Sequence, residues 1–315
     1  MAGLRSVDED PLRTGRPRGS SSGRSKRVPI APYLYLALPV LVYGTFSLWP
    51  TLQLLLLSLN DWDGLGPQRF IGIQNFVELL GDDVFWEALT HNLLWMVGAA
   101  LFPVGIGLLL ASLLARSATF GRTALRTVYF LPQVLATVAV AVIWGWIYDP
   151  TFGAVNTMLT MVGLRGLAMP WLGDQTTALP ALFITWTWVQ YGFSMVVLLA
   201  GMNAIDEVFY DAAKVDGAGR WHQFRHITIP FLSGPLATVV LVTAIGAFQL
   251  FDLVFVMTRG GPGTSTQVLD IYMLENAIRY SRVGYGAAIA VALSAMVWFF
   301  SILYLRARGT FRAER

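Results

Sequence analysis

The chain has no cysteine among its 315 residues and only two lysines. The absence of cysteine excludes disulfide bonds and thiolate metal ligands. A phosphate-binding P-loop ends in glycine, lysine and then serine or threonine. Lys26 and Lys214 follow Ser25 and Ala213 instead of glycine. We therefore expect that the chain holds no ATP of its own and is not an ATPase.

Histidine is also scarce, with three in the whole chain. His222 and His226 are four residues apart, a spacing that places two side chains on one helix face. The zinc-enzyme pattern H-E-x-x-H also needs a glutamate, and Gln223 stands in its place. With no convergent set of acid, base or metal ligands, the sequence predicts no metal site, no cofactor and no enzyme.

Charge is the third shortage: 13% of the residues are charged and 55% are hydrophobic. The chain contains six stretches without a charged residue, and each is long enough for a helix of about 20 residues to cross a bilayer. Since a spanning segment must satisfy its own backbone groups, we expect an all-α integral membrane protein. The predicted spans are 32–57, 89–115, 127–147, 179–204, 232–257 and 285–305.

The basic residues are distributed unevenly between the connections. Seventeen of the 22 lie in the two tails, in the connection after the second span and in the connection after the fourth. The positive-inside rule then places both termini and these two connections in the cytoplasm. The sequence pI of about 9.3 therefore reflects orientation, and no nucleic-acid partner is expected.

Three regions follow from the composition. Residues 1–29 are rich in Arg, Ser, Gly and Pro and should form a disordered basic cytoplasmic tail. Residues 30–308 form the six-helix membrane domain, and 309–315 form a short cytoplasmic tail. Small residues at four-residue spacing in the sixth span (Gly284, Ala288 and Ala292), together with Gly105 and Gly201, favour close helix packing.

A polar segment at 206–230 separates the fourth and fifth spans. Acidic residues at its start and Lys214 later suit a short helix, because they complement the helix dipole. Gly217 can adopt the left-handed conformation that ends such a helix. A second amphipathic helix should then lead to Pro230 at the membrane surface. Periodicity alone does not distinguish this arrangement from a plain surface hairpin.

This segment resembles the cytoplasmic "EAA" loop of permease subunits in ATP-binding-cassette importers, of general form E-A-A-x-x-D-G-A-x-x-x-x-x-F-x-x-I-x-x-P. The first position departs from that pattern, since Asp211 replaces glutamate. The resemblance implies that the loop docks on a separate ATPase. The positions that match in register are Ala212, Ala213, Asp216, Gly217, Ala218, Phe224, Ile227 and Pro230.

Further motifs are similar to the carbohydrate-uptake branch of these permeases, which includes the maltose and glycerol-phosphate types. They are the F-x-G-x-x-N-F pattern at 70–76, Phe-Leu-Pro at 130–132, Phe-Asp at 251–252 and Thr-Arg-Gly-Gly-Pro at 258–262. The resemblance implies a bacterial inner-membrane importer of a sugar or oligosaccharide that works by alternating access. The implied partners are a second homologous permease, two ATP-binding subunits and an extracytoplasmic solute-binding protein.

A secondary transporter or channel subunit for a small polar solute is the alternative. Such proteins carry charges or broken helices at the membrane midplane as coupling sites. Asp252 is the one acid that the predicted spans contain, and it faces either a cavity or the outer interface.

The substrate path is predicted from residues that suit a sugar, which has apolar C–H faces and a polar hydroxyl rim. The fourth span offers Trp188, Gln190, Tyr191 and Phe193, and the fifth offers Gln249 and Asp252. On an ideal helix the last two lie about 300° apart and so share a face. The resemblance to maltose permeases implies a sugar site in these two stretches. For any single aromatic residue, packing or an interfacial belt is an equal alternative.

Overall fold

The computed structural model describes residues 31–116 and 121–307, and these ranges are predominantly helical. The predicted tails at 1–29 and 309–315 lie outside the described residues. Contacts within the chain divide it into two units, Met1–Pro50 and Thr51–Arg315.

The described part of the first unit is a single apolar helix. It consists of α1 (Ala31–Tyr43), the π-helical turn Gly44–Leu48 and the start of α2 (Trp49–Leu57), which continues into the second unit. The π-helical turn ends two residues before Pro50, which lacks an N–H and cannot bond to the carbonyl four residues earlier. Tyr35–Leu57 is long and apolar enough to cross a membrane, as expected for the first span.

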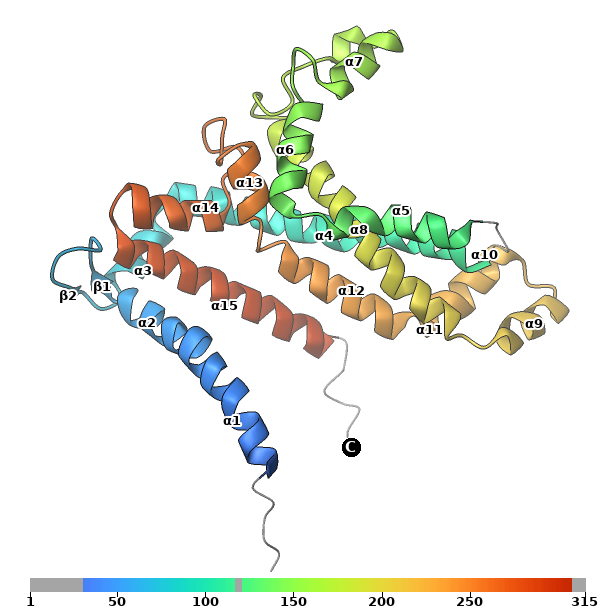
Figure 1. The fold of residues 1–315 in the computed structure, drawn as a ribbon, viewed down its shortest axis with the longest axis horizontal. Helices are drawn as coiled ribbons and strands as arrows, with labels where there is room; N and C mark the ends of the chain where they lie inside the picture. The colour runs from blue at the N-terminus through green and yellow to red at the C-terminus, as the bar shows by residue number, and fades with distance from the viewer. Residues whose placement is uncertain (1–30, 117–120, 308–315) are drawn as a thin grey trace, which may run out of the picture. The chain divides into compact units, whose positions relative to one another are not determined.

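The second unit is a helical bundle with a small two-stranded ribbon (Figure 1). In the ribbon, β1 (Asn60–Asp61) pairs antiparallel with β2 (Arg69–Phe70). The helices that follow in chain order are α3 (Gln74–Leu80), α4 (Asp83–Arg116), α5 (Arg122–Val134), α6 (Thr137–Ile147), α7 (Ala154–Met161), the 3-10 turn Arg165–Leu167, α8 (Ala178–Asn203), α9 (Glu207–Val215), α10 (Arg220–Gln223), the π turn Phe224–Thr228, α11 (Ile229–Phe231), α12 (Ser233–Gly246), α13 (Phe251–Met257), α14 (Leu269–Leu274), the π turn Glu275–Arg279 and α15 (Val283–Ala307).

The second, fourth and sixth predicted spans are continuous helices, α4, α8 and α15. The third and fifth are not the straight helices that the sequence predicts. α5 and α6 meet at a bend of 98° just after Pro132, and α12 ends at Gly246, before the short helix α13 begins. The described chain has four helices that can span a membrane, or up to six if each of two bent pairs is one span. These pairs are α5 with α6, and Arg220–Phe231 with Ser233–Gly246, which meet at 70°.

Close helix packing depends on particular glycines. A Cβ at Gly107 would lie 2.4 Å from the Ser194 Cβ and 2.7 Å from the Met195 nitrogen, so α4 and α8 touch there through their backbones. Gly105, which the sequence suggested for this role, has nothing within 4 Å of its Cβ position. The prediction of Gly105 was therefore wrong by two residues. Gly105 and Gly107 are separated by about 200° of helix rotation, so they lie on nearly opposite faces of α4. Gly201 does meet a neighbour, with Leu232 2.8 Å from its Cβ position.

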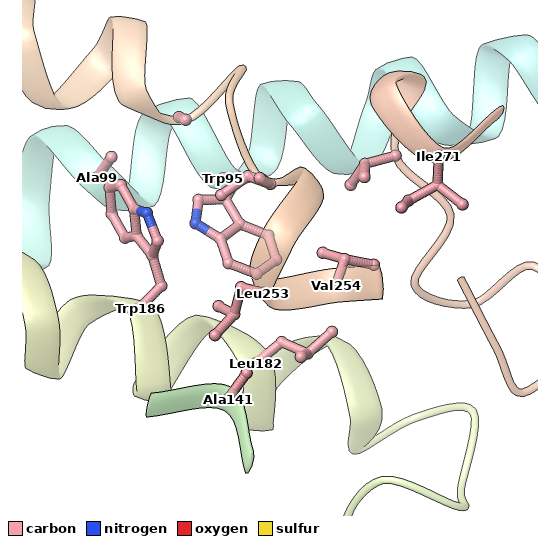
Figure 2. Close-up of a cluster of buried hydrophobic side chains, with 11 residues drawn as sticks. Trp95, Ala99, Ala141, Leu182, Trp186, Leu253, Val254 and Ile271 are labelled. Atoms are coloured by element: carbon pink, nitrogen blue, oxygen red, sulfur yellow. The ribbon is translucent and has the colours of Figure 1, made fainter. Parts of the chain in front are cut away.

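One core cluster joins five helices (Figure 2). Trp95 from α4 and Trp186 from α8 meet edge to face, with ring centroids 6.2 Å apart. The same cluster includes apolar side chains from α6, α13 and α14: Ala141, Leu253, Val254 and Ile271. The short helices α6 and α13 are therefore fixed to the bundle by buried contacts, although each lies beyond a break in its span.

At the predicted outer end, one carboxylate ties three elements together. Asp82, at the turn before α4, accepts hydrogen bonds from the hydroxyl groups of Tyr272 and Tyr285. It also accepts from the N–H groups of Val84 and Phe85. Burial raises the pKa of Asp82, but these four bonds outweigh it and hold the pKa below its usual 3.8.

Asp82→Asn should destabilise the outer end of the bundle. Hydrogen bonds to a charged group contribute about 1.5–3 kcal/mol each, so we expect a loss of about 2 kcal/mol in unfolding free energy. The charge-dependent part is present above about pH 4 and is lost as the pH falls through the lowered pKa. Thermal unfolding in detergent at pH 7 measures the loss. A wild-type melting temperature for the variant would contradict the role of Asp82.

Candidate functional site

The polar segment after α8 folds as a two-armed loop. The N-cap of α9 is Asp206, whose carboxylate accepts a hydrogen bond from the Val208 N–H at 3.0 Å. Lys214 pairs with Asp211 at 2.8 Å on the exposed side of the helix. This arrangement explains why the segment is helical: an N-cap acid at the start and a basic residue in the last turn both suit the helix dipole.

α9 ends in a Schellman motif around Gly217, whose φ is +77°. The Gly217 N–H donates to the Lys214 carbonyl at 3.0 Å, and the Ala218 N–H donates to the Ala213 carbonyl at 2.8 Å. These are the two bonds that define the motif. The left-handed turn predicted at Gly217 is confirmed.

The second arm runs from Arg220 to Phe231 through α10, a π turn and α11. It packs against the first arm at two points. The Tyr210 hydroxyl hydrogen-bonds with the Thr228 hydroxyl at 2.9 Å, and the Phe209 and Phe231 rings lie 4.8 Å apart. The helix–turn–helix loop predicted at 206–230 is therefore present, and its two arms are bonded into one unit that leads into α12.

The loop residues predicted from the motif are mostly accessible. Asp211, Ala212, Asp216, Gly217 and Pro230 are exposed, whereas Ala213, Ala218 and Phe224 are partly buried. The sequence pattern predicted no structural role for Gln223, which is 6% exposed and donates to the Ala218 carbonyl at 2.9 Å. The only feature of the sequence that could have indicated this role was the polar side chain of Gln223, on the inner side of the second arm.

A second candidate site lies at the break in the fifth predicted span, residues 247–250. α12 has 14 residues, about 21 Å at 1.5 Å per residue, which is shorter than the hydrocarbon core. Non-helical backbone at membrane depth is tolerated where it is buried in protein or lines a water-filled cavity. Ala247, Phe248 and Leu250 are buried, and only Gln249 in the break is exposed.

Two side chains from other elements bond to the backbone of this break. Asn92 on α4 donates to the Ala247 carbonyl at 3.2 Å and accepts from the Leu269 N–H at 3.0 Å. Asp270 on α14, outside the candidate spans, accepts from the Leu250 N–H at 3.1 Å. Burial raises the pKa of Asp270 to about 6, against the opposing effect of this bond.

The break overturns one expectation. Gln249 and Asp252 do not share the face of a continuous helix, because Gln249 lies in the break and Asp252 in the first turn of α13. Both side chains are exposed. Asp252 therefore lies in the first turn of a short helix, and not in the middle of a continuous span.

The four residues predicted on α8 are not brought together on one face. The Trp188 ring lies 5.7 Å from that of Trp144 on α6, whereas Phe193 packs into the core between α4, α8 and α12. Gln190 and Tyr191 are partly buried. An apolar cavity of about 420 Å³ lies between α4, α12 and α15 in the described bundle, and none of the six path residues lines it.

Residues 104–311 match the model of the family described as "Binding-protein-dependent transport system inner membrane component". The chain belongs to this family. The match includes the two-armed loop and the break, so both lie within the family's domain. This permease is a multi-pass membrane protein.

Relatives cover nearly the whole permease. It is 34% identical to the probable ABC transporter permease YurN of Bacillus subtilis, over 90% of this chain and 98% of that protein. It is 31% identical to the lactose transport permease LacF of Rhizobium radiobacter, over 90% and 96% of the two chains. It is 32% identical to the sulfoquinovosyl glycerol permease SmoG of Agrobacterium fabrum, over 87% and 88%.

The fold is also similar to that of a chain in the crystal structure of a bacterial ABC transporter that imports alginate. The TM-score is 0.78 over 90% of this chain and 96% of that chain, at 22% identity. At this identity the likeness concerns the fold alone.

Proposed function

We propose that this permease forms part of the membrane pathway of a sugar or oligosaccharide importer. The observation that carries the proposal is its likeness, over almost the full chain, to relatives named for lactose and sulfoquinovosyl glycerol transport. A further relative, 31% identical, is named for diacetylchitobiose uptake. Deletion of the gene should abolish uptake of one labelled sugar, and re-expression should restore it. Unchanged uptake of every sugar tested, with loss of amino-acid uptake instead, would contradict the proposal.

The importer needs partners that this chain lacks. We infer a second homologous permease, two ATP-binding subunits that hold the ATP, and an extracytoplasmic solute-binding protein. The exposed tip of the loop at Asp216 and Gly217 supports docking on an ATPase. Because the two arms are bonded together and continue into α12, movement of the loop is passed to the broken fifth span. Transport follows from a shift between two global states that ATP and the loaded binding protein favour differently.

We further propose six crossings in a bacterial inner membrane, with both ends and the loop at 206–230 in the cytoplasm. The distribution of basic residues supports this orientation, with α5 and α6 counted together as the third crossing and α12 and α13 together as the fifth. A cytoplasmic reporter fused after Arg315 should be active, and an export-dependent reporter at the same site should be silent. The reverse pattern would rule out this topology.

Gln249→Ala and Tyr191→Ala should impair sugar uptake while leaving assembly and basal ATPase activity of the complex largely unchanged. Both side chains have polar atoms suited to sugar hydroxyl groups, and Gln249 is exposed at the break. Losing one hydrogen bond to a neutral partner costs about 1 kcal/mol, or roughly five-fold in apparent affinity. Uptake in proteoliposomes gives KM and the maximal rate. Wild-type kinetics for both variants would place the path elsewhere, or in the partner permease.

A further inference from the structure

The break between α12 and α13 differs from a continuous helix by a small set of hydrogen bonds. In a continuous helix, the Leu250 N–H would bond to the Gly246 carbonyl and the Phe251 N–H to the Ala247 carbonyl. Here the Gly246 carbonyl accepts from the Gln249 N–H at 3.0 Å instead. The helix resumes when the Val254 N–H bonds to the Leu250 carbonyl at 3.1 Å.

The groups released by the break are taken up by side chains of other elements. The Ala247 carbonyl receives the Asn92 amide, 155 residues away in sequence. Asp270 accepts a hydrogen bond from the Leu250 N–H, and the neighbouring Phe251 N–H also favours its charged form. These are the same backbone groups that a continuous helix would have paired with one another or with Gly246. Asn92 is fully buried, so its bonds do not compete with water.

We propose that Asn92 and Asp270 are positioning residues that hold the fifth span broken and thereby present Gln249 to the translocation path. Neither side chain needs to touch the transported solute. The term "translocation path" rests on the proposed function, whereas the broken conformation and its supports do not.

The sequence of the break itself does not require a break, which supports the role of Asn92 and Asp270. Residues 247–257 contain no proline, so nothing in that stretch prevents helical hydrogen bonding. An unpaired buried backbone group costs about 1–3 kcal/mol, and re-forming the helix is the nearest way to avoid that cost. Loss of either support should therefore favour a continuous α12–α13 helix. Regular helix at this point would withdraw Gln249 from its exposed position.

The absence of cysteine from the chain allows a direct test. In Gln249→Cys, the rate of modification by a small hydrophilic maleimide measures the exposure of position 249 in native membranes containing the assembled transporter. Leu65→Cys, at a residue 97% exposed in the outer loop, serves as the labelling reference. This readout requires no knowledge of the transported solute, so a wrong sugar assignment would leave it interpretable.

Asn92→Asp and Asp270→Leu should each slow the labelling of Gln249→Cys by about five-fold or more. Neither substitution should change the labelling rate of Leu65→Cys. Asn92→Asp is nearly isosteric and keeps the acceptor for Leu269, but it loses the donor to Ala247. Asn156→Asp is the matched control. Asn156 is also a buried asparagine bonded to backbone carbonyls, those of Pro150 and Met169, but it lies away from the break.

Asp270→Asn keeps one oxygen acceptor. In this variant, the maleimide should modify Gln249→Cys at nearly the rate seen with Asp270 intact. This variant keeps the test decisive if Asp270→Leu fails to reach the membrane. Equal labelling in wild type, Asn92→Asp and Asp270→Leu would overturn the proposal. So would an equal slowing by Asn156→Asp, because the effect would then be general destabilisation. In uptake assays, the effects of Asn92→Asp and Gln249→Ala on KM should be non-additive, since both act through position 249.

Discussion

Gly217→Glu should yield a membrane-inserted permease that has lost nearly all uptake. Gly217 has a φ of +77°, and its Cβ position has nothing within 4 Å. A side chain there therefore has space, and the cost to folding is the left-handed strain of about 1–2 kcal/mol. The glutamate would instead protrude, charged, from the exposed tip of the loop beside Asp216.

We expect uptake to fall by about 30-fold or more, which corresponds to about 2 kcal/mol of lost docking energy at the centre of an interface. Co-purification of the ATP-binding subunits should fall in parallel. Gly217→Asn is the matched control, because asparagine tolerates the left-handed conformation and adds no charge. Normal transport by Gly217→Glu would remove the loop from the mechanism.

Gly107→Ala should destabilise the bundle more than any alanine substitution at an open glycine. Its Cβ would fall 2.4 Å from the Ser194 Cβ and 2.7 Å from the Met195 nitrogen, so α4 and α8 would have to separate. Overpacking of this kind costs about 1–3 kcal/mol. For a chain of this size, we expect the melting temperature in detergent to fall by about 5 °C. Gly107→Leu should not accumulate in the membrane.

Gly105→Ala provides the control on the same helix. Its Cβ position is open, and alanine is a better helix former than glycine by up to about 1 kcal/mol. Its melting temperature should therefore match or exceed that of wild type. Equal stability of the two alanine variants would mean that α4 and α8 do not pack through Gly107.

These two glycines cannot be told apart from the sequence alone. A pattern of small residues indicates that helices pack closely, but it does not give the rotation of one helix against the next. Gly107 and Gly105 are both glycines on α4, and only the position of α8 distinguishes them. The same limit applied on α8, where Trp188 and Phe193 were predicted together but contact different neighbours.

The loop was predicted more successfully because its signals are local. The N-cap at Asp206, the pairing of Asp211 with Lys214 and the left-handed turn at Gly217 each depend on residues within a few positions. Neighbouring groups determine such features whatever the rest of the chain does. The mutual bonding of the two arms, through Tyr210 and Thr228, appeared only in the folded chain.

By itself, the sequence determined the membrane class, the number and approximate positions of the apolar segments, and the presence of the loop, since hydropathy and local capping are additive along the chain. The tertiary structure decided that the third and fifth segments are broken. Residues 232–257 read as one apolar run, because the groups that stabilise its break belong to Asn92 and Asp270. A helix and a broken helix leave similar patterns in sequence, and distant hydrogen-bonding partners determine which of the two forms.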